Sequence, residues 1–266
     1  MPKIWKKACA EDRKNGENRM EQYTAFAAWY DRMMGTVAYE DWARYLDGLL
    51  QEAGAKTVAE CACGTGNLTW RLIKAGYSVT ALDISEDMLL TAREKLRKMG
   101  LSCPFVREDM RTLSLHQPVD AVVAACDGVN YLTEGAEEFF AAAYRALKPG
   151  GILLFDVSSD YKLRYVLSGR TFGDTGADWG YVWENAMEPN SPLLEMELTC
   201  FVKQGTGYAR FEETHWQRAY TKEELTKALE RAGFVKIEVY EAFTRHAPGG
   251  RTERLQFAAR RPKDLQ

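Results

Sequence analysis

Hydrophobic positions follow two periods along this chain, and the switches between them mark its elements. Apolar residues recur every three or four positions over 20–34 and 39–53, which predicts two amphipathic helices. Short apolar runs then alternate with helical patterns. They predict strands at 57–61, 78–82, 103–107, 119–125 and 151–157, and helices at 66–75, 86–98 and 134–147. Strands that alternate with helices form a parallel sheet covered on both faces.

Local signals set several element ends. Ser85 is the expected N-cap of helix 86–98. Thr221 and Glu224 have the capping-box spacing at the start of a helix at 221–232. The Pro and two Gly within 147–151 predict a turn between a helix and the strand that follows.

Residues 158–218 break the alternation of strands and helices. Period-two stretches at 181–183, 194–198, 200–202 and 208–211 predict short antiparallel strands. We expect this insertion to lie over the carboxyl edge of the parallel sheet. After the helix at 221–232, two strands at 234–241 and 253–260 end the chain.

The predicted organisation has four parts. A polar N-terminal extension at 1–18 is expected to be flexible. A core with N-terminal lid helices occupies 19–157, the antiparallel cap 158–220, and the completion of the core sheet 221–266.

Composition narrows the class of protein. The chain has 266 residues, of which 46% are hydrophobic, enough for a sizeable core. A formal net charge of -3 gives no basic footprint for nucleic acid. Since no apolar run approaches the roughly 20 residues of a membrane helix, and the N-terminus lacks a signal-peptide core, we expect a cytoplasmic protein that binds no membrane. Six scattered Cys and three His suggest neither a disulfide scaffold nor a metal site.

The stretch 58–67 combines the features of a cofactor-binding turn. An apolar strand carries Glu60 near its end, and Gly64 and Gly66 stand directly before a helical pattern. Such glycines let the backbone approach a ligand closely. The next strand ends in Asp83, whose carboxylate can accept both hydroxyls of a ribose.

Two residues distinguish this turn from the turn of a dinucleotide-binding site. The dinucleotide fingerprint has a third glycine where Thr69 stands. Glu60 would repel a pyrophosphate but attract a cationic amino group. A cofactor with a ribose, an adenine and a zwitterionic amino acid fits better, and S-adenosylmethionine is such a cofactor.

At this point the chain resembles a known family. The segment 60–66 resembles motif I of the class I S-adenosylmethionine-dependent methyltransferases. Asp83 matches the ribose-binding acid of that family, Asp109 and Met110 its adenine-side pair, and the turn at 147–151 the one before its fifth strand. The likeness covers about 21–157, and the last helix and two strands fit the family's ending. It implies a three-layer Rossmann-like α/β fold with a seven-stranded sheet, whose last strand is antiparallel, and a small antiparallel cap.

Within that class, the chain is similar to bacterial small-molecule methyltransferases that carry an antiparallel cap. The segments 126–132, 153–157 and 211–218 carry this likeness. It is also similar to the N-methyltransferases that act on glycine or on amino sugars. The family resemblance implies the following residues around the cofactor: Tyr23, Glu60, Cys61, Ala62, Cys63, Gly64, Gly66, Asn67, Leu68, Asp83, Ile84, Met88, Asp109, Met110, Cys126 and Asp127.

Candidates for the acceptor side come from the lid, the fourth strand and the cap. His215, Asn130 and Tyr30 are the candidate catalytic residues, and Tyr131 and Arg218 are expected to bind the substrate. Alternatives stay open. His215 can be a cap or interface histidine, and Tyr30 can belong to an aromatic stripe that packs on the sheet.

Two further sets of cap residues leave alternatives open. Arg218 can bind an acceptor carboxylate or pair with Glu212 or Glu213. The aromatic residues of the insertion can cage an amine, form a small core or make the surface of a homodimer. These aromatic residues are Tyr161, Tyr165, Phe172, Trp179, Tyr181 and Trp183.

The sequence therefore predicts a methyltransferase that moves a methyl group from S-adenosylmethionine to N or O of a small molecule. An NAD-dependent oxidoreductase and a non-catalytic S-adenosylmethionine-binding module are the alternatives. The identity of the acceptor, the atom methylated and the oligomeric state stay open.

Overall fold

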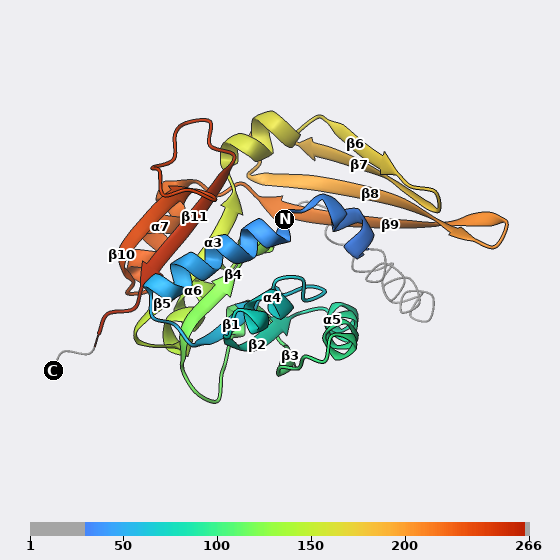
Figure 1. Ribbon diagram of the computed structural model, residues 1–266. Coiled ribbons are helices and arrows are strands. Elements are labelled where there is room, and N and C mark those ends of the chain that lie inside the picture. Colours follow the sequence, from blue (N-terminus) through green and yellow to red (C-terminus); the bar gives the residue numbers. More distant parts are fainter. Residues whose placement is uncertain (1–29, 264–266) are drawn as a thin grey trace.

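A computed structural model describes residues 30–263 of the protein. Its main sheet has seven strands in the order β10-β11-β5-β4-β1-β2-β3 (Figure 1). The strands are β1 (Thr57–Cys61), β2 (Ser78–Asp83), β3 (Phe105–Arg107), β4 (Val119–Ala124), β5 (Leu147–Ser158), β10 (Val235–Glu241) and β11 (Arg254–Arg260). Only β11 runs antiparallel to its neighbours β5 and β10 among these strands. The predicted fold class is confirmed.

Helices cover both faces of this sheet. On one face, α3 (Tyr39–Glu52) and α4 (Thr69–Lys74) bury Trp42 and Leu72 against Val58, Val123 and other strand residues. Helix α5 (Glu86–Lys98) packs through Leu89 on the same face. On the other face, α6 (Ala136–Ala146) and α7 (Lys222–Arg231) contribute to a cluster that includes Phe139, Phe155 and Phe257. The result is the expected three-layer arrangement.

The predicted caps form. The Ser85 hydroxyl accepts a hydrogen bond from the Met88 N–H at 3.3 Å at the start of α5. At the start of α7, the Thr221 hydroxyl accepts from the Glu224 N–H and the Glu224 carboxylate accepts from the Thr221 N–H. These local signals work because they satisfy N–H groups that have no partner inside the helix.

The predicted turn at 147–151 is different in the structure, because it lies inside β5. Val119 pairs with Leu147 and Ala121 pairs with Ile152, so residues 148–151 bulge opposite Asp120. A Cβ on Gly151 would lie 2.9 Å from the Lys148 carbonyl oxygen and 3.0 Å from that of Asp120. The glycine therefore allows a tight bulge rather than a turn that ends the pairing.

The cap is a second, four-stranded antiparallel sheet with longer strands than predicted. It contains β6 (Thr171–Thr175), β7 (Trp179–Met187), β8 (Leu193–Gln204) and β9 (Gly207–Arg218). The stretches predicted at 194–198 and 200–202 are one strand, because Thr199 between them continues the alternation of inward and outward side chains. A helical segment, η4 (Lys162–Leu167), was not predicted. Figure 1 shows the cap, in yellow to orange, arching over the end of the core sheet.

One apolar cluster forms the interior of the cap, and a second joins the cap to the N-terminal segment and α5. Leu163 and Leu167 of η4 pack against Leu194 and Met196, with Phe172 and Trp183 beside them. For Phe172 and Trp183 the small-core interpretation is therefore confirmed. The second cluster joins Leu198 and Cys200 of β8 to Tyr30, Met33 and Met88.

Residues 30–33 are helical and continue into η1 (Met34–Thr36) below the cap. The rest of the helix predicted at 20–34, including Tyr23, lies outside the described residues. Among the helices that the structure describes, none is long and apolar enough to cross a membrane.

Candidate functional site

The predicted cofactor turn lies where β1 and β2 end. Gly64 and Gly66 have φ angles of +55° and +75°, which side-chain-bearing residues rarely adopt. The Gly64 N–H donates to one Asp83 carboxylate oxygen at 2.8 Å, and the Ser85 N–H donates to the other at 2.9 Å. Asp83 thus links the turn to the end of β2. Burial raises the pKa of its carboxyl group, against the opposing effect of these backbone donors.

Glu60 is buried at the base of this turn. Its side chain is only 3% exposed, and its Oε2 atom has no hydrogen-bond partner among the described residues. Burial raises the pKa of this carboxyl group to about 8. The neighbouring Thr69 side chain opposes this shift. A buried carboxyl oxygen without a partner is costly, so a ligand group that donates a hydrogen bond to Glu60 would be favoured there.

A polar network that the sequence did not reveal holds the other side of the turn. One Asp31 carboxylate oxygen accepts from the Thr65 hydroxyl at 2.6 Å and from the Asn67 amide at 2.9 Å. Lys95 of α5 lies 2.7 Å from the other oxygen and donates to the Asn67 amide oxygen at 2.8 Å. Burial opposes ionisation of Asp31, but its hydrogen bonds from Lys95 and Thr65 lower its pKa. The Asn67 side chain, predicted to touch the cofactor, is engaged in this network instead.

Several predicted cofactor residues have side chains that point into the core. Cys61, Cys63 and Leu68 are buried in three separate apolar clusters. Burial raises the pKa of both thiols, which keeps them protonated. Of these residues, only the backbone remains to contact a ligand. Ala62, by contrast, is exposed and has a φ of +53°.

The predicted adenine side has one side chain already in an ion pair. Asp109 accepts from the Arg111 guanidinium through both carboxylate oxygens, with Nε distances of 3.0 and 2.9 Å. This contact lowers the pKa of Asp109. Met110 packs on the core, while Ile84 is 63% exposed. Contact of these residues with an adenine stays a prediction.

Tyr30 reaches from the N-terminal segment toward the end of β4. Burial raises its pKa well above the usual value, and Tyr39, Tyr131, Cys126 and Asp127 add to the effect. Cys126 and Asp127 both have left-handed backbones, with φ of 58° and 65°. The structure therefore brings Tyr30 together with the segment predicted to lie beside the methyl group.

Asn130 has a different role from the predicted one. Its side chain is fully buried, and its amide nitrogen donates to the Ser158 and Arg218 carbonyl oxygens at 3.0 and 2.9 Å. Its amide oxygen accepts from the Ser158 N–H at 2.9 Å. These bonds occupy the amide, so we interpret Asn130 as a structural clamp and correct its assignment as a catalytic residue.

Arg218 pairs with neither Glu212 nor Glu213. Its guanidinium lies 3.5 Å from Glu224 of α7 and packs over the Tyr220 ring at 5.0 Å. Both alternative partners are engaged elsewhere, since Glu212 pairs with Arg210 and Glu213 with His215. Binding of an acceptor carboxylate by Arg218 stays a prediction.

His215 is placed on the inner face of the cap. Its Nε2 atom lies 2.8 Å from the Glu213 carboxylate, and its ring stands edge-on to the Tyr131 ring with centroids 6.1 Å apart. Tyr131 is 49% exposed. The structure therefore joins two predicted acceptor residues, His215 and Tyr131, to Glu213. The sequence contained a signal for Glu213, since residues two apart on a strand share a face.

The sequence also did not predict a cluster of buried charged residues at the ends of β4, β5 and β11. Arg254 pairs with Asp127 and with the fully buried Asp156. The Asp127 N–H donates to Asp156 at 3.2 Å. Burial raises the pKa of Asp156 to about 6, although Arg254 opposes the shift. Asp127, predicted to contact the cofactor, thus has its carboxylate in an ion pair.

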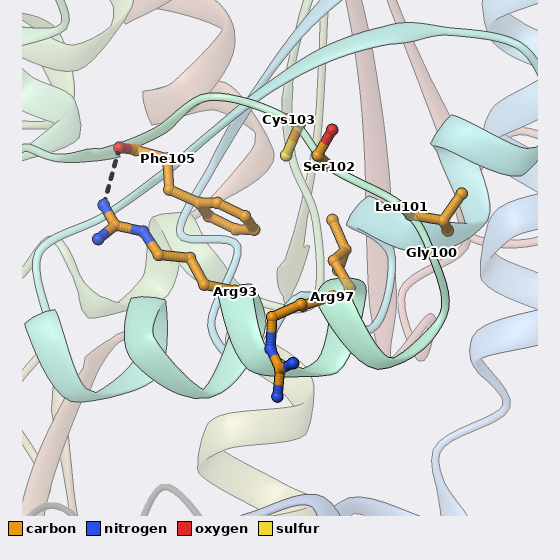
Figure 2. Close-up of a pocket in the computed structure, with 8 residues that line it drawn as sticks. Arg93, Arg97, Gly100, Leu101, Ser102, Cys103 and Phe105 are labelled. Carbon is orange, nitrogen blue, oxygen red and sulfur yellow. Dashed lines mark hydrogen bonds between the residues drawn. The ribbon is translucent and has the colours of Figure 1, made fainter.

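A shallow pocket lies apart from this site, between α5 and the segment 100–105 (Figure 2). Its wall contains Arg93, which donates to the Phe105 carbonyl oxygen at 3.2 Å. None of the predicted site residues lines it, so we assign it no part in the candidate site. Within residues 30–263, no three His, Cys, Asp or Glu side chains are grouped as metal ligands.

The chain is similar to known proteins over most of its length. A family model described as a methyltransferase domain matches residues 58–151. YqeM of Bacillus subtilis (strain 168), a protein named as a methyltransferase without a stated acceptor, is 37% identical over 246 residues, which cover 91% of this chain and 98% of YqeM.

Solved structures agree with this likeness. An S-adenosylmethionine-dependent methyltransferase from Clostridium acetobutylicum superposes with a TM-score of 0.82 at 30% identity, covering 90% of this chain and 99% of that one. An amino pentose methyltransferase from Micromonospora echinaspora, solved with bound S-adenosylmethionine, gives a TM-score of 0.69 at 25% identity and covers 89% of this chain and 96% of its own.

Proposed function

This chain belongs to the S-adenosylmethionine-dependent methyltransferases, and on that premise we propose that it methylates N or O of a small molecule. We propose that the acceptor binds between η3 (Gly128–Tyr131) and the inner face of the cap. Membership of this family excludes the hypothesis of an NAD-dependent oxidoreductase. It also argues against the hypothesis of a non-catalytic module, which would need no Glu–His pair on the acceptor side.

The single observation that carries the donor site is the buried Glu60. Its unpartnered carboxyl oxygen would accept a hydrogen bond from the ammonium group of the cofactor's amino acid, and that positive charge would favour the ionised form of Glu60. Asp83 retains lone pairs for the ribose hydroxyls beside the backbone N–H groups that it already accepts. Ile84 and Met110 are the proposed apolar contacts of the adenine.

Bound S-adenosylmethionine supplies a methyl group on a positively charged sulfur. What the chain must add is position and exclusion of water, because methyl transfer is an in-line displacement. We assign the exclusion of water to Tyr30 and to the cap residues that pack on it. These cap residues include Leu198 and Cys200. His215 and Tyr131 are the proposed polar contacts of the acceptor.

An amine acceptor is the first class to test. The amino pentose methyltransferase shares the fold and, by its name, acts on an amine-bearing sugar. We therefore propose a panel of amino sugars and glycine, with a phenol and a thiol as the alternative nucleophiles. Release of S-adenosylhomocysteine from S-adenosylmethionine is the readout, and calorimetry with S-adenosylhomocysteine against NAD checks the donor site separately.

We expect micromolar binding of S-adenosylhomocysteine, no binding of NAD, and product release with a member of the amine or hydroxyl classes. Release with the thiol alone would overturn the proposed acceptor chemistry. A Tyr131→Ala variant that keeps cofactor affinity and loses turnover would support the acceptor location. Unchanged turnover in that variant would move the acceptor elsewhere.

A further inference from the structure

The segment after β4 carries two consecutive residues in an uncommon backbone conformation. Cys126 and Asp127 have φ angles of 58° and 65°, in the left-handed region that residues other than glycine rarely adopt. Asp127 is the N-cap of η3, and its carbonyl oxygen accepts from the Asn130 N–H at 2.8 Å. A Cβ on Gly128 would lie 3.1 Å from the Cβ of Ala62. Asp127 therefore lies between the cofactor turn and η3, on the proposed acceptor side.

A cluster of buried charged residues holds the Asp127 carboxylate. Its Oδ1 atom accepts from the Arg254 guanidinium, which also pairs with Asp156. The Asp127 N–H donates to Asp156 Oδ2 at 3.2 Å. Asp156 is fully buried, and the Arg254 guanidinium packs over the Trp42 ring at 5.5 Å. The core thus fixes both the backbone and the side chain of Asp127, so its carboxylate has a defined orientation before a ligand binds.

The second carboxylate oxygen of Asp127, Oδ2, is available to a ligand. Within residues 30–263 no hydrogen bond is donated to this oxygen, and the side chain is 23% exposed. Lys162 of η4 is a second cation near the cluster: burial and the charge of Arg254 lower its pKa, and Asp127 opposes the shift. In the described part of the chain, however, Lys162 forms no ion pair with Asp127. A cation therefore contacts Asp127 at Oδ1 alone.

A carboxylate at this place suits an amine acceptor. A neutral amine can donate one N–H to Oδ2 while its lone pair faces the methyl group. The lone pair then forms a bond to the methyl carbon, and the bond from that carbon to sulfur breaks and leaves its electron pair on sulfur. The positive charge thereby moves from sulfur to nitrogen. A fixed negative charge beside the nitrogen stabilises this charge as it develops.

A hydroxyl acceptor would gain less from the same carboxylate. Its oxygen loses a proton in the reaction, so the product is an uncharged ether and no positive charge remains on the acceptor. A methylated amine keeps its positive charge until it releases a proton to water. The gain from a fixed negative charge is therefore larger for nitrogen than for oxygen.

We propose that Asp127, held by Arg254 and Asp156, binds the acceptor through its Oδ2 atom and selects amines over hydroxyl compounds. This inference rests on the proposed function and narrows it to acceptors whose nucleophilic atom is nitrogen. It also assigns Asp127 to the acceptor side, and not to the cofactor contacts expected from the sequence.

The first test needs no acceptor. Sinefungin carries an ammonium group where S-adenosylmethionine carries its methyl group, whereas S-adenosylhomocysteine has neither group. The ratio of the two Kd values, measured by calorimetry, therefore reports the negative charge at this place. We expect Asp127→Asn to reduce the preference for sinefungin about tenfold, as for the loss of a charge-assisted hydrogen bond, while the Kd for S-adenosylhomocysteine is roughly unchanged.

Asparagine suits this position because it also tolerates a left-handed backbone and can still accept from Arg254. Glu253→Gln is the matched control, since Glu253 precedes Arg254, is exposed and loses the same charge. We expect the control to keep the preference for sinefungin. Equal preferences in the Asp127→Asn and Glu253→Gln proteins would overturn the proposal. An equal loss of affinity for both ligands in Asp127→Asn would also overturn it, because Asp127 would then be a cofactor contact.

The second test compares an amino sugar with the same sugar that carries a hydroxyl group in place of the amino group. We expect turnover with the amino sugar, and we expect Asp127→Asn to lower its kcat/KM by about tenfold or more. Turnover with the hydroxyl compound alone, or an unchanged kcat/KM in the variant, would overturn the proposal. If no compound of the panel is methylated, the proposed function fails, while the preference for sinefungin still decides on Asp127.

Discussion

Replacement of Lys95 by Met tests whether the network around Asp31 sets cofactor affinity. The Lys95 ammonium lies 2.7 Å from Asp31, 2.8 Å from the Asn67 amide oxygen and 3.2 Å from the Thr65 hydroxyl. Thr65 and Asn67 flank Gly66 in the cofactor turn. Lys95→Met therefore removes the only cation that joins α5, the turn and the helix end at 30–33 within the described residues.

The magnitude follows from burial. Hydrogen bonds to charged groups contribute about 1.5–3 kcal/mol when well buried and exposed pairs about 0.2–1 kcal/mol. Lys95 and Asp31 are 16% and 33% exposed, so an intermediate value of about 1.5 kcal/mol is appropriate after discounting for solvent screening. That free energy corresponds to about a tenfold change in a dissociation constant. We expect Lys95→Met to raise the Kd for S-adenosylhomocysteine by about this factor, as measured by calorimetry.

The same helix supplies the control. Lys98 pairs with Glu94 at 2.9 Å, but the two side chains are 67% and 58% exposed. Lys98→Met therefore removes the same charge from α5 without touching the turn, and we expect the Kd to stay within twofold. If both variants bind equally well, the network does not hold the turn in its binding conformation and the argument is refuted.

Two further predictions concern buried polar groups. Burial raises the pKa of Glu60 to about 8, so this carboxyl group stays neutral in the folded, cofactor-free protein up to about that pH. In the unfolded chain it ionises near its usual, lower pKa. The stability of the fold therefore decreases as the pH rises from about 5 to 8. We expect Glu60→Gln to flatten the fall in Tm across this range, and parallel Tm curves for variant and wild type would contradict the assignment. Asn130→Ala removes three hydrogen bonds to backbone groups of Ser158 and Arg218, so we expect it to lower the free energy of unfolding in urea by about 3 kcal/mol. A loss of turnover at unchanged stability would instead restore Asn130 as a catalytic candidate.

Much of the core fold could be predicted because its signals are local. Ser85 and Thr221 act on N–H groups within three residues, and each strand of the parallel sheet is a separate apolar run. The cap was harder. Strands β8 and β9 pair over twelve positions, and a single polar residue such as Thr199 looks like an interruption until its partner strand is known. The bulge in β5 likewise depends on Asp120, which is distant in sequence.

The candidate site likewise contains residues that the sequence could predict and residues that it could not. Gly64, Gly66 and Asp83 meet because consecutive parallel strands end at one edge of a sheet, which sequence order already implies. Arg254 and Asp127 meet because β11 inserts beside β5, across more than a hundred residues. The acid in the otherwise apolar run of β5, Asp156, was a signal that could have been used. The occupied amide of Asn130 had no counterpart in the sequence.

The bonds of Asn130 have a consequence for how this protein can change. Ser158 is the last residue of β5, where the chain leaves the core, and Arg218 is the last residue of β9, where it returns. The side chain of Asn130 thus binds both ends of the cap, a segment of roughly 60 residues, to the short helix η3 of the core. A grafted cap would therefore have to keep these two junctions and the contacts of Leu198 and Cys200 with Tyr30, Met33 and Met88. With those contacts kept, we expect a new acceptor preference to arise without any alteration of the sheet.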